Sequence, residues 1–311
     1  MLSFYLPLTK YPYHGSRAAC PVCRCEQGSK ICGLDRRWKR LPTYACDHCG
    51  LLFTNPMPRE DELANYYTHL YRWDYQGAVD GPKQRHLRKR LVEARHRASQ
   101  LSRLLGERSR TLDFGCGTGE FIGQLLSGGH DAHGFEPGKT YGDYARSEHG
   151  ERVQIRTWQD ADYDGKFDAV TCFHVLEHLR DPIAALRQMA RWTHPDGYVY
   201  VEVPNMGEAT SVKGFGGFHF AHVLGFNHHN LLLAASQVGL QPKVIVADTA
   251  IIFEHGEGVC RDREARCGRE LARELYGDSK AFKNYFRYQT SKLLPAVTNR
   301  RVSKANRRNA A

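Results

Sequence analysis

Long apolar runs are missing from this chain of 311 residues. No stretch approaches the roughly 20 consecutive apolar residues that a membrane-spanning helix needs, although 41% of the residues are hydrophobic. Internal repeats and low-complexity tracts are also lacking, and the 25% of charged residues is ordinary for a globular protein. These absences exclude an integral membrane protein and a disordered chain. The length leaves room for one core domain and a smaller unit.

We expect no secretory leader in this sequence. The first residues, MLSFYLPLTKYPYHG, have neither a basic leader, nor a continuous apolar segment, nor a small-residue cleavage site. We therefore expect a cytoplasmic protein whose thiols stay reduced.

Positive charge exceeds negative charge, with a formal net charge of +10. The excess comes mainly from residues 83–110 and from the basic tail after residue 299. Such segments predict contact with an anionic partner or surface, or else solvated helix faces and a frayed end, because net charge bears on association more than on fold.

Six of the ten cysteines lie between residues 20 and 49, and this clustering favours a metal over disulfides. Cys20-Pro-Val-Cys23 and Cys46-Asp-His-Cys49 are paired knuckles that complete one tetrahedral site with no open position. We predict a structural zinc ion here, since a unit of about 40 residues has too small an apolar core to fold unaided.

Two further cysteines leave the ligand set open. Cys25 and Cys32 lie between the knuckles, and either could replace Cys20 or Cys23.

Beyond residue 110, short apolar runs alternate with helical stretches, a pattern typical of a doubly wound α/β fold. Before it, Leu87, Leu91, Ala94, Leu101 and Leu105 recur at helical spacing and predict one amphipathic helix. We expect a zinc-binding module at 1–60, a helical linker at 61–106 with a break at 77–82, a catalytic domain at 107–255 and a basic helical extension at 256–311.

A glycine-rich loop follows the first strand of this region. Asp113 precedes three glycines at alternate positions, Gly115, Gly117 and Gly119, and a helical pattern starts directly after them. Glycines let the backbone pass close beneath a ligand, and the helix start offers amide donors. Glu136 ends the next strand, where a carboxylate can accept both ribose hydroxyls of a nucleoside.

Four ordered motifs carry a family resemblance: LDFGCGTGEF, GFEPG, FDAVTCFHVLEHLRDP and HPDGYVYVEVPN. Together, over about residues 111–240, they resemble class I S-adenosylmethionine (SAM) dependent methyltransferases. The resemblance implies a Rossmann-like, seven-stranded sheet in which the loop holds the amino-acid part of SAM and Glu136 holds the ribose. The cofactor residues it implies are Asp113, Gly115, Cys116, Gly117, Gly119, Glu136, Pro137, Trp158, Phe173 and His174. For the adenine, Gln159 and Asp160 are alternatives to Trp158.

A nicotinamide-binding domain is the alternative for such a loop. That class prefers the spacing GxGxxG, whereas this chain has Glu120 and Phe121 where the last glycine belongs. The spacing therefore favours the methyltransferase.

Methyl transfer needs a positioned acceptor and, for a hydroxyl, a base. His174, Glu177 and His178 fall at i, i+3 and i+4 and project to one side of a helical turn. They suit an acid, a base or a metal ligand, or else Glu177 and His178 only stabilise the turn. Related O-methyltransferases with a Glu-x-x-Glu-His version bind a divalent ion there, whereas this chain has His174 in place of the first glutamate.

His222 lies in AHVLGFNHHNLLLAASQVGL, a stretch that resembles one common among glycan and small-molecule methyltransferases. By that resemblance His222 is the first choice for general base, and a histidine bonded to the backbone of a lid is the alternative. Glu202 and Asn205, at the end of the YVYVEVPN strand, are expected to line the same cavity.

The resulting hypothesis is O-methylation of a sugar, glycan or other small polar acceptor. The resemblance of the zinc unit to ribbons in related enzymes associates the chain with polysaccharide or natural-product synthesis. RNA methylation is an alternative that the basic segments favour, although the Asn-Pro-Pro-aromatic stretch of amino-group methyltransferases is absent. A noncatalytic SAM-binding or zinc scaffold is the third.

Overall fold

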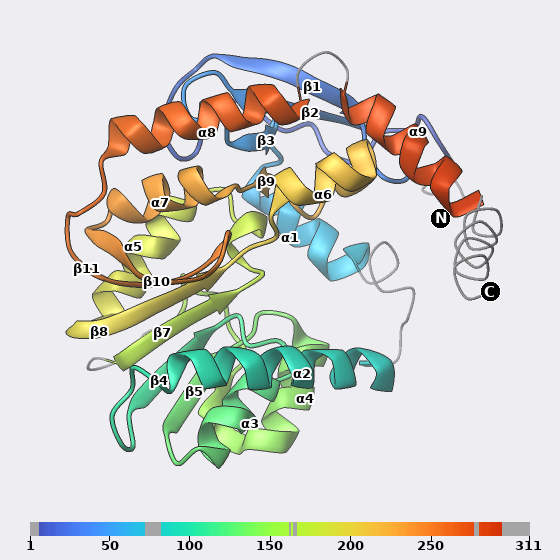
Figure 1. The fold of residues 1–311 in the computed structure, drawn as a ribbon. Helices are drawn as coiled ribbons and strands as arrows, with labels where there is room; N and C mark the ends of the chain where they lie inside the picture. The colour runs from blue at the N-terminus through green and yellow to red at the C-terminus, as the bar shows by residue number, and fades with distance from the viewer. Residues whose placement is uncertain (1–5, 72–81, 162, 164–166, 277–279, 294–311) are drawn as a thin grey trace, which may run out of the picture.

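The computed structural model describes residues 6–71, 82–161, 163, 167–276 and 280–293. Two sheets and the helices around them make up this part of the chain (Figure 1). The interdomain break expected at 77–82 and the basic tail fall almost wholly outside the described residues. Within them, no helix combines the length and apolarity that crossing a membrane requires.

The larger sheet has seven strands in the order β10-β11-β8-β7-β4-β5-β6. Its neighbouring strands are parallel except where β11 pairs antiparallel with β8 and β10. The predicted Rossmann-like sheet is thereby confirmed, with one reversed strand near an edge. Its strands are β4 (Arg110–Phe114), β5 (Asp131–Phe135), β6 (Val153–Gln154), β7 (Phe167–Phe173), β8 (Thr193–Glu202), β10 (Leu240–Ala247) and β11 (Ala250–His255).

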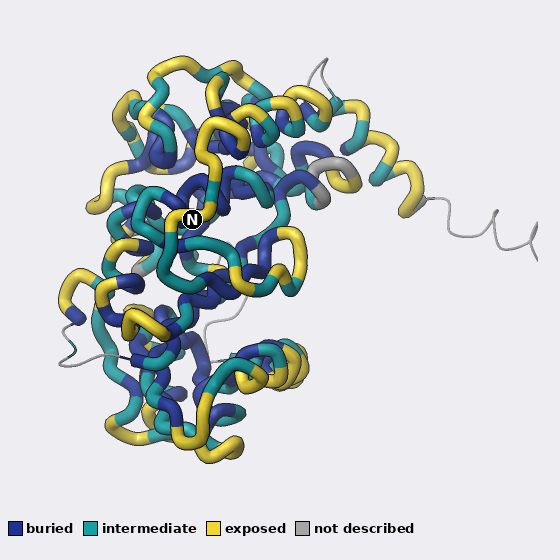
Figure 2. The backbone as a smooth tube through the Cα atoms, turned by 60° about the vertical axis from the view of Figure 1, so that its left-hand side comes forward, coloured by how far each residue is buried: buried dark blue, intermediate teal, exposed yellow. Residues whose placement is uncertain are grey.

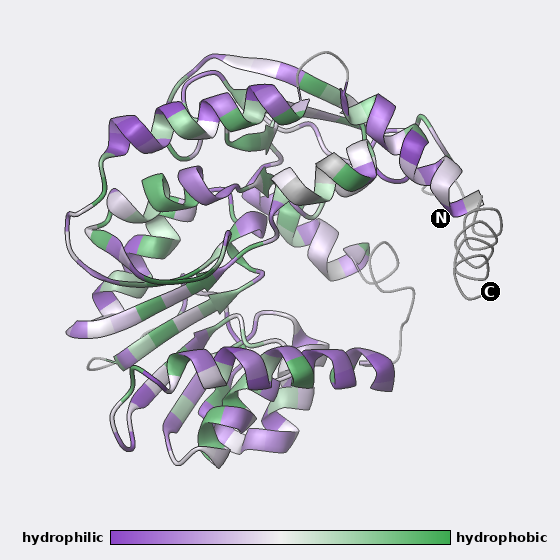
Figure 3. Ribbon diagram, in the orientation of Figure 1, coloured by the Kyte–Doolittle hydropathy of each residue, from purple (hydrophilic) through white to green (hydrophobic). Residues whose placement is uncertain are grey.

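Helices cover both faces of this sheet, as its apolar strands require (Figures 1 and 3). One face packs on α2 (Gln84–Leu101), α3 (Glu120–Ser127) and α4 (Lys139–His149), and the other on α5 (Pro182–Trp192) and α7 (His228–Ser236). Capping side chains fix the N-terminal ends of two of these helices. The side chain of Asp181 accepts a hydrogen bond from the Ala184 amide at the start of α5, and Asn227 forms a capping box at the start of α7.

The amphipathic helix predicted through Leu105 is shorter than expected. α2 ends at Leu101, and Leu105 packs on the same apolar cluster from the turn that follows. Partial burial of the Leu105 side chain therefore does not require helical backbone.

The smaller sheet has the order β1-β2-β3-β9. β1 (Gly28–Leu34), β2 (Arg40–Cys46) and β3 (Leu52–Thr54) come from the cysteine-rich N-terminal part, whereas β9 (Leu224–Gly225) comes from far along the chain. One apolar cluster runs from this part into the larger sheet, joining Leu51 and Phe53 with Val199 and Phe226. Figure 2 shows the buried backbone continuing through the middle of the molecule.

The remaining α-helices among the described residues are α1 (Glu60–His69), α6 (Met206–Lys213), α8 (Arg261–Tyr276) and α9 (Lys280–Leu293). α8 and α9 form the helical C-terminal extension expected from the sequence and lie beside the small sheet (Figure 1). The proposed domain boundaries at residues 60, 106 and 255 stay predictions.

Candidate active site and metal centre

The glycine-rich loop lies between β4 and α3, as predicted. Gly115, Gly117 and Gly119 have φ angles of 75°, 58° and 84°, in the left-handed region that favours glycine. A Cβ added to Gly115 would lie only 2.7 Å from Cγ2 of Val175. The loop thus passes very close to the turn that carries the predicted histidines.

Glu136 faces this loop from the end of β5. Its carboxylate accepts hydrogen bonds from the amides of Gly117, at 3.1 Å, and Gly138, at 2.8 Å. Burial raises the pKa of this carboxyl, while the two amides act against that rise. The loop and the acid, 17 residues apart in sequence, are thus joined by a direct hydrogen bond.

Asp113 is buried at the end of β4. The Thr171 hydroxyl donates a hydrogen bond of 2.7 Å to it, yet burial raises the pKa of Asp113 to about 6. A cationic group, such as the amino group of an amino acid, would stabilise the ionised form.

The other cofactor candidates lie around the same loop. Cys116 is buried and its amide bonds to the Phe135 carbonyl, and Pro137 is exposed just after Glu136. Trp158 is half-buried against Phe114, with ring centroids 6.2 Å apart.

Arg97 is a residue that the sequence reasoning missed. It points from α2 to Glu202, which it binds through two hydrogen bonds of 2.9 and 2.7 Å, and it covers the ring of Phe173. Burial would raise the pKa of Glu202, but the bonds from Arg97 and His174 lower it to about 2. The available signal was an arginine between Ala94 and Leu101 on the apolar stripe of the helix.

The predicted histidines converge on Glu177. This carboxylate is 1% exposed, and neither oxygen has a hydrogen-bond partner in the described part of the chain. Its Oε1 lies 3.6 Å from Nε2 of His178, 3.7 Å from Nε2 of His222 and 3.8 Å from Nδ1 of His174. The ligand atoms of Glu177, His178 and His222 are close enough to share a divalent ion.

His178 and His222 are held in different ways. Nδ1 of His178 lies 2.8 Å from both the Tyr67 hydroxyl and the Ala221 carbonyl, so Nε2 faces Glu177. Burial and the neighbouring His219 lower the pKa of His222 well below its usual value. His222 is therefore neutral near pH 7. Tyr67, on α1, had no distinguishing sequence signal.

His174 differs from these two in charge and backbone. Burial alone would lower its pKa, but Glu177 and Glu202 raise it to about 9. His174 lies at the turn from β7 to the short helix η4 (Leu176–His178), and its φ angle of 57° is uncommon outside glycine. His174 is thus a cation near pH 7, and this charge sets it apart from His222.

Asn205 lies just after β8, and its side-chain amide donates to Asp248. Glu202 joins Arg97 and His174, so it helps to position the histidine turn. His228 begins α7, and Nδ1 of His229 pairs with Glu264 at 2.7 Å.

The paired knuckles bring four thiols together. The Sγ atoms of Cys20 and Cys49 are 3.6 Å apart, those of Cys23 and Cys46 are 3.4 Å apart, and all four lie within 4.8 Å of one another. Thiolates around tetrahedral zinc, with Zn–S of about 2.3 Å, lie about 3.8 Å apart. The donor set fits zinc.

The other cysteines lie outside this group. Cys25 donates to the Gln27 carbonyl and Cys32 to the Leu34 carbonyl. Cys172 is buried in β7. The geometry thus favours the simple pairing of knuckles over a set containing Cys25 or Cys32.

Comparison with known proteins places this site in a family. Residues 84–242, about half of the chain, match the family model described as a methyltransferase domain. A ubiquinone biosynthesis O-methyltransferase of Aliivibrio fischeri (strain MJ11) is 34% identical over 103 residues, which cover 31% of this chain and 44% of that relative. This chain thus matches less than half of that relative's length.

Solved structures show weaker likenesses. Magnesium protoporphyrin IX methyltransferase from Synechocystis, with bound SAH, is 16% identical with a TM-score of 0.47, over 63% of this chain and 98% of that one. DesVI from Streptomyces venezuelae is 24% identical with a TM-score of 0.34, over 44% and 57%. The family model, which spans strands β4 to β8 of the large sheet, the glycine-rich loop and the turn with His174 and His178, shows that the chain belongs to the SAM-dependent methyltransferases.

Proposed function

We propose that this enzyme transfers the methyl group of SAM to a hydroxyl of a sugar, a glycan or another small polar acceptor. The observation that carries the proposal is the contact between Gly115 and Val175, which sets the glycine-rich loop beside the Glu177 cluster. An oxygen acceptor also agrees with the O-methyltransferase relatives.

The cofactor would lie along the glycine-rich loop. Glu136 would accept hydrogen bonds from the ribose hydroxyls, and ionised Asp113 would face the amino group of the methionine part. SAM supplies a methyl group already activated on a sulfonium. The chain therefore has to orient both reactants and handle one proton.

His222 is proposed as the base. It would take the hydroxyl proton on Nε2 while the acceptor oxygen bonds to the methyl carbon and the carbon–sulfur bond breaks, leaving its electrons on sulfur. Glu177, 3.7 Å from Nε2, would stabilise the imidazolium. His174, being protonated near pH 7, is the weaker candidate.

We also propose that Cys20, Cys23, Cys46 and Cys49 hold one structural zinc ion. The tetrahedral set leaves no open position, so it has no part in the chemistry. A reducing cytoplasm would suit four unpaired thiols.

The test has two steps on zinc-loaded, full-length protein. Calorimetry first measures binding of SAM and of its demethylated product, and then labelled SAM is incubated with nucleotide sugars, glycans and RNA. Label on a sugar or glycan oxygen supports the proposal. Label in RNA alone rejects the proposal in favour of RNA methylation. Tight SAM binding with no transfer to any acceptor favours a noncatalytic scaffold.

A further inference from the structure

The strand after His222 belongs to the sheet of the zinc module. β9 pairs antiparallel with β3, with Leu52 opposite Gly225 and Phe53 opposite Leu224. The Thr54 amide also donates a 2.9 Å hydrogen bond to the carbonyl of Val223, the residue next to His222. The fourth strand of the module's sheet thus begins two residues after the proposed base.

The second cysteine knuckle determines where β3 begins. Cys49 precedes Leu52 by three residues, and the Cys46 amide donates to the Leu51 carbonyl at 2.9 Å. Gly50, between them, has a φ angle of 73°, and an added Cβ would lie 2.1 Å from the Gly268 carbonyl oxygen on α8. The second knuckle therefore packs closely against the backbone of α8, and β3 begins three residues after its last cysteine.

The N-terminal part also holds the other end of the histidine segment. The Arg36 amide donates to the Phe218 carbonyl at 2.9 Å, and the ring of Tyr11 stacks on Phe220 with centroids 4.6 Å apart. Residues 218–225 therefore have module contacts on both sides of His222.

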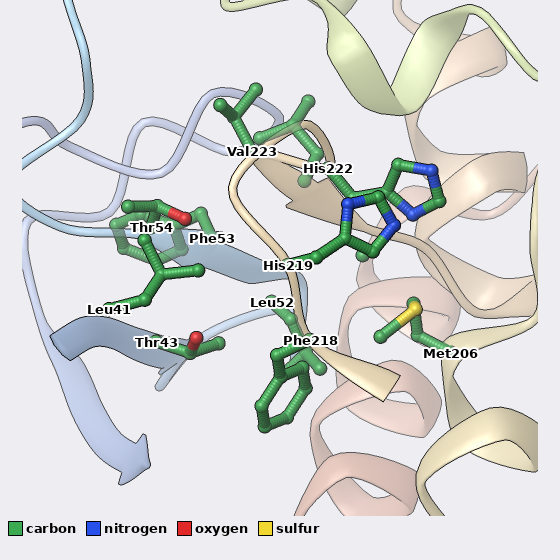
Figure 4. Close-up of a pocket in the computed structure, with 12 residues that line it drawn as sticks. Leu41, Thr43, Leu52, Phe53, Thr54, Met206, Phe218, His219, His222 and Val223 are labelled. Carbon is green, nitrogen blue, oxygen red and sulfur yellow. The ribbon is translucent and has the colours of Figure 1, made fainter. Parts of the chain in front are cut away.

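A small cavity marks the junction. Figure 4 shows His219 and His222 close together, with Met206 on one side and Leu41 and Thr43 of β2 on the other. Residues of the module and of the catalytic domain thus line the same space.

The glycine-rich loop depends on other contacts. Its partners are Val175, the Phe135 carbonyl, Glu136 and Arg90, which come from the large sheet, its turns and α2. Loosening β3 should therefore affect the base and leave the cofactor loop in place.

We infer that the zinc module is a positioning element for His222: metal at the four cysteines holds β3, and β3 holds the segment 218–225 through β9. A module this small owes much of its stability to its metal, so losing the metal frees the segment. The link to turnover rests on the proposed function, but the structural link can be measured without it.

The decisive variant is Thr54→Pro in the zinc-loaded, full-length protein. Proline removes the amide that bonds to Val223 and leaves all four cysteines intact. The matched control is Thr54→Val, which keeps the amide and the side-chain shape. The readouts are zinc content, hydrogen exchange of the peptides covering 218–226 and 111–137, and calorimetric affinity for the demethylated product of SAM.

We expect exchange over 218–226 to rise by about tenfold or more in Thr54→Pro, as for a locally opened segment, with little change over 111–137. Zinc content and product affinity should match wild type, and Thr54→Val should resemble wild type. Cys23→Ser, which loses a ligand, should show the same local rise.

Two results would overturn the inference. One is unchanged exchange over 218–226 in both Thr54→Pro and Cys23→Ser. The other is an equal rise in both peptides with loss of product affinity, which would mean general unfolding. Failure to methylate any acceptor would count against the proposed function only, since exchange reports the coupling directly.

Discussion

Asp113 is a carboxyl group placed where water cannot solvate its charge. The Thr171 hydroxyl donates a hydrogen bond to this carboxyl group, yet burial raises the pKa of Asp113 from 3.8 to about 6. A raised pKa means that the folded protein is stabilised at low pH and loses that contribution as the pH rises through 6. Above pH 6 the ionised side chain costs about 3 kcal/mol of stability in the SAM-free protein.

Asp113→Asn should therefore stabilise the SAM-free protein near pH 7.5 by up to about 3 kcal/mol while weakening SAM binding. Denaturant unfolding at pH 7.5 and pH 4 measures the first effect, and calorimetry measures the second. The gain over wild type should shrink towards pH 4, where the carboxyl of Asp113 is protonated in the folded protein and partly protonated in the unfolded chain. An equal gain at both pH values would contradict the assignment.

Glu136→Ala should weaken SAM binding by about 1 to 3 kcal/mol, because charge-assisted hydrogen bonds to the ribose are lost. Calorimetry with the folded variant gives the value. Glu148→Ala, an exposed position on α4, is the control. Wild-type affinity in Glu136→Ala would mean that the carboxylate does not hold the ribose.

His222→Ala should lower turnover by about a hundredfold or more with SAM affinity nearly intact, because a base acts on the acceptor and not on the cofactor. Single-turnover rates with labelled SAM measure it, and the exposed His194→Ala serves as control. Surviving turnover would assign the proton to another group.

At the scale of elements, the second cysteine knuckle and α8 are fitted backbone to backbone. A Cβ added to Gly50 would lie 2.1 Å from the carbonyl oxygen of Gly268. A Cβ added to Gly268 would lie 2.4 Å from the carbonyl oxygen of Cys49. The small sheet is thereby fixed against the helices that follow the catalytic segment.

Gly50→Ala should destabilise the protein by about 3 kcal/mol or more, from backbone strain together with overlap. Gly129→Ala is a matched control, because Gly129 also has a positive φ, of 85°, but has no atom near an added Cβ. Thermal unfolding of the two variants separates the two costs. Equal losses would show that the close approach to α8 contributes nothing.

At the scale of the whole molecule, the two sheets contribute to one apolar cluster, and β9, from far along the chain, completes the small sheet. Damage to the metal centre should therefore reach beyond the first 60 residues.

Chelation of zinc should lower the melting temperature of the full-length chain clearly, because the metal contributes folding free energy that the small module cannot replace. Calorimetric melting with and without a chelator, beside metal analysis, measures this. Added Zn²⁺ should restore the transition and Mg²⁺ should not, since thiolates prefer the softer ion. A melt that is indifferent to zinc loss would refute the structural role.

Local sequence patterns were enough to predict most helices and strands and part of the candidate site. Glycine spacing, the apolar strands and the Cys-x-x-Cys pairs each depend on neighbours in sequence. The doubly wound α/β fold followed from the order of the elements, and the number of strands from the family resemblance. Arg97 and Tyr67 were missed because their roles depend on partners over 100 residues away, Glu202 and His178. The end of α2 was misplaced because Leu105 packs, partly buried, on the apolar cluster without being helical.

The sequence alone determined the class of fold, the glycine-rich loop with its acid, and the four cysteines of the candidate zinc site. Each of these can be recognised from the spacing of residues that are near one another in sequence. Only the tertiary structure decided that Glu177 gathers histidines from two segments, and that the strand beside His222 completes the sheet of the N-terminal module. Those arrangements come from pairing and packing between residues far apart in the chain, which no local pattern records.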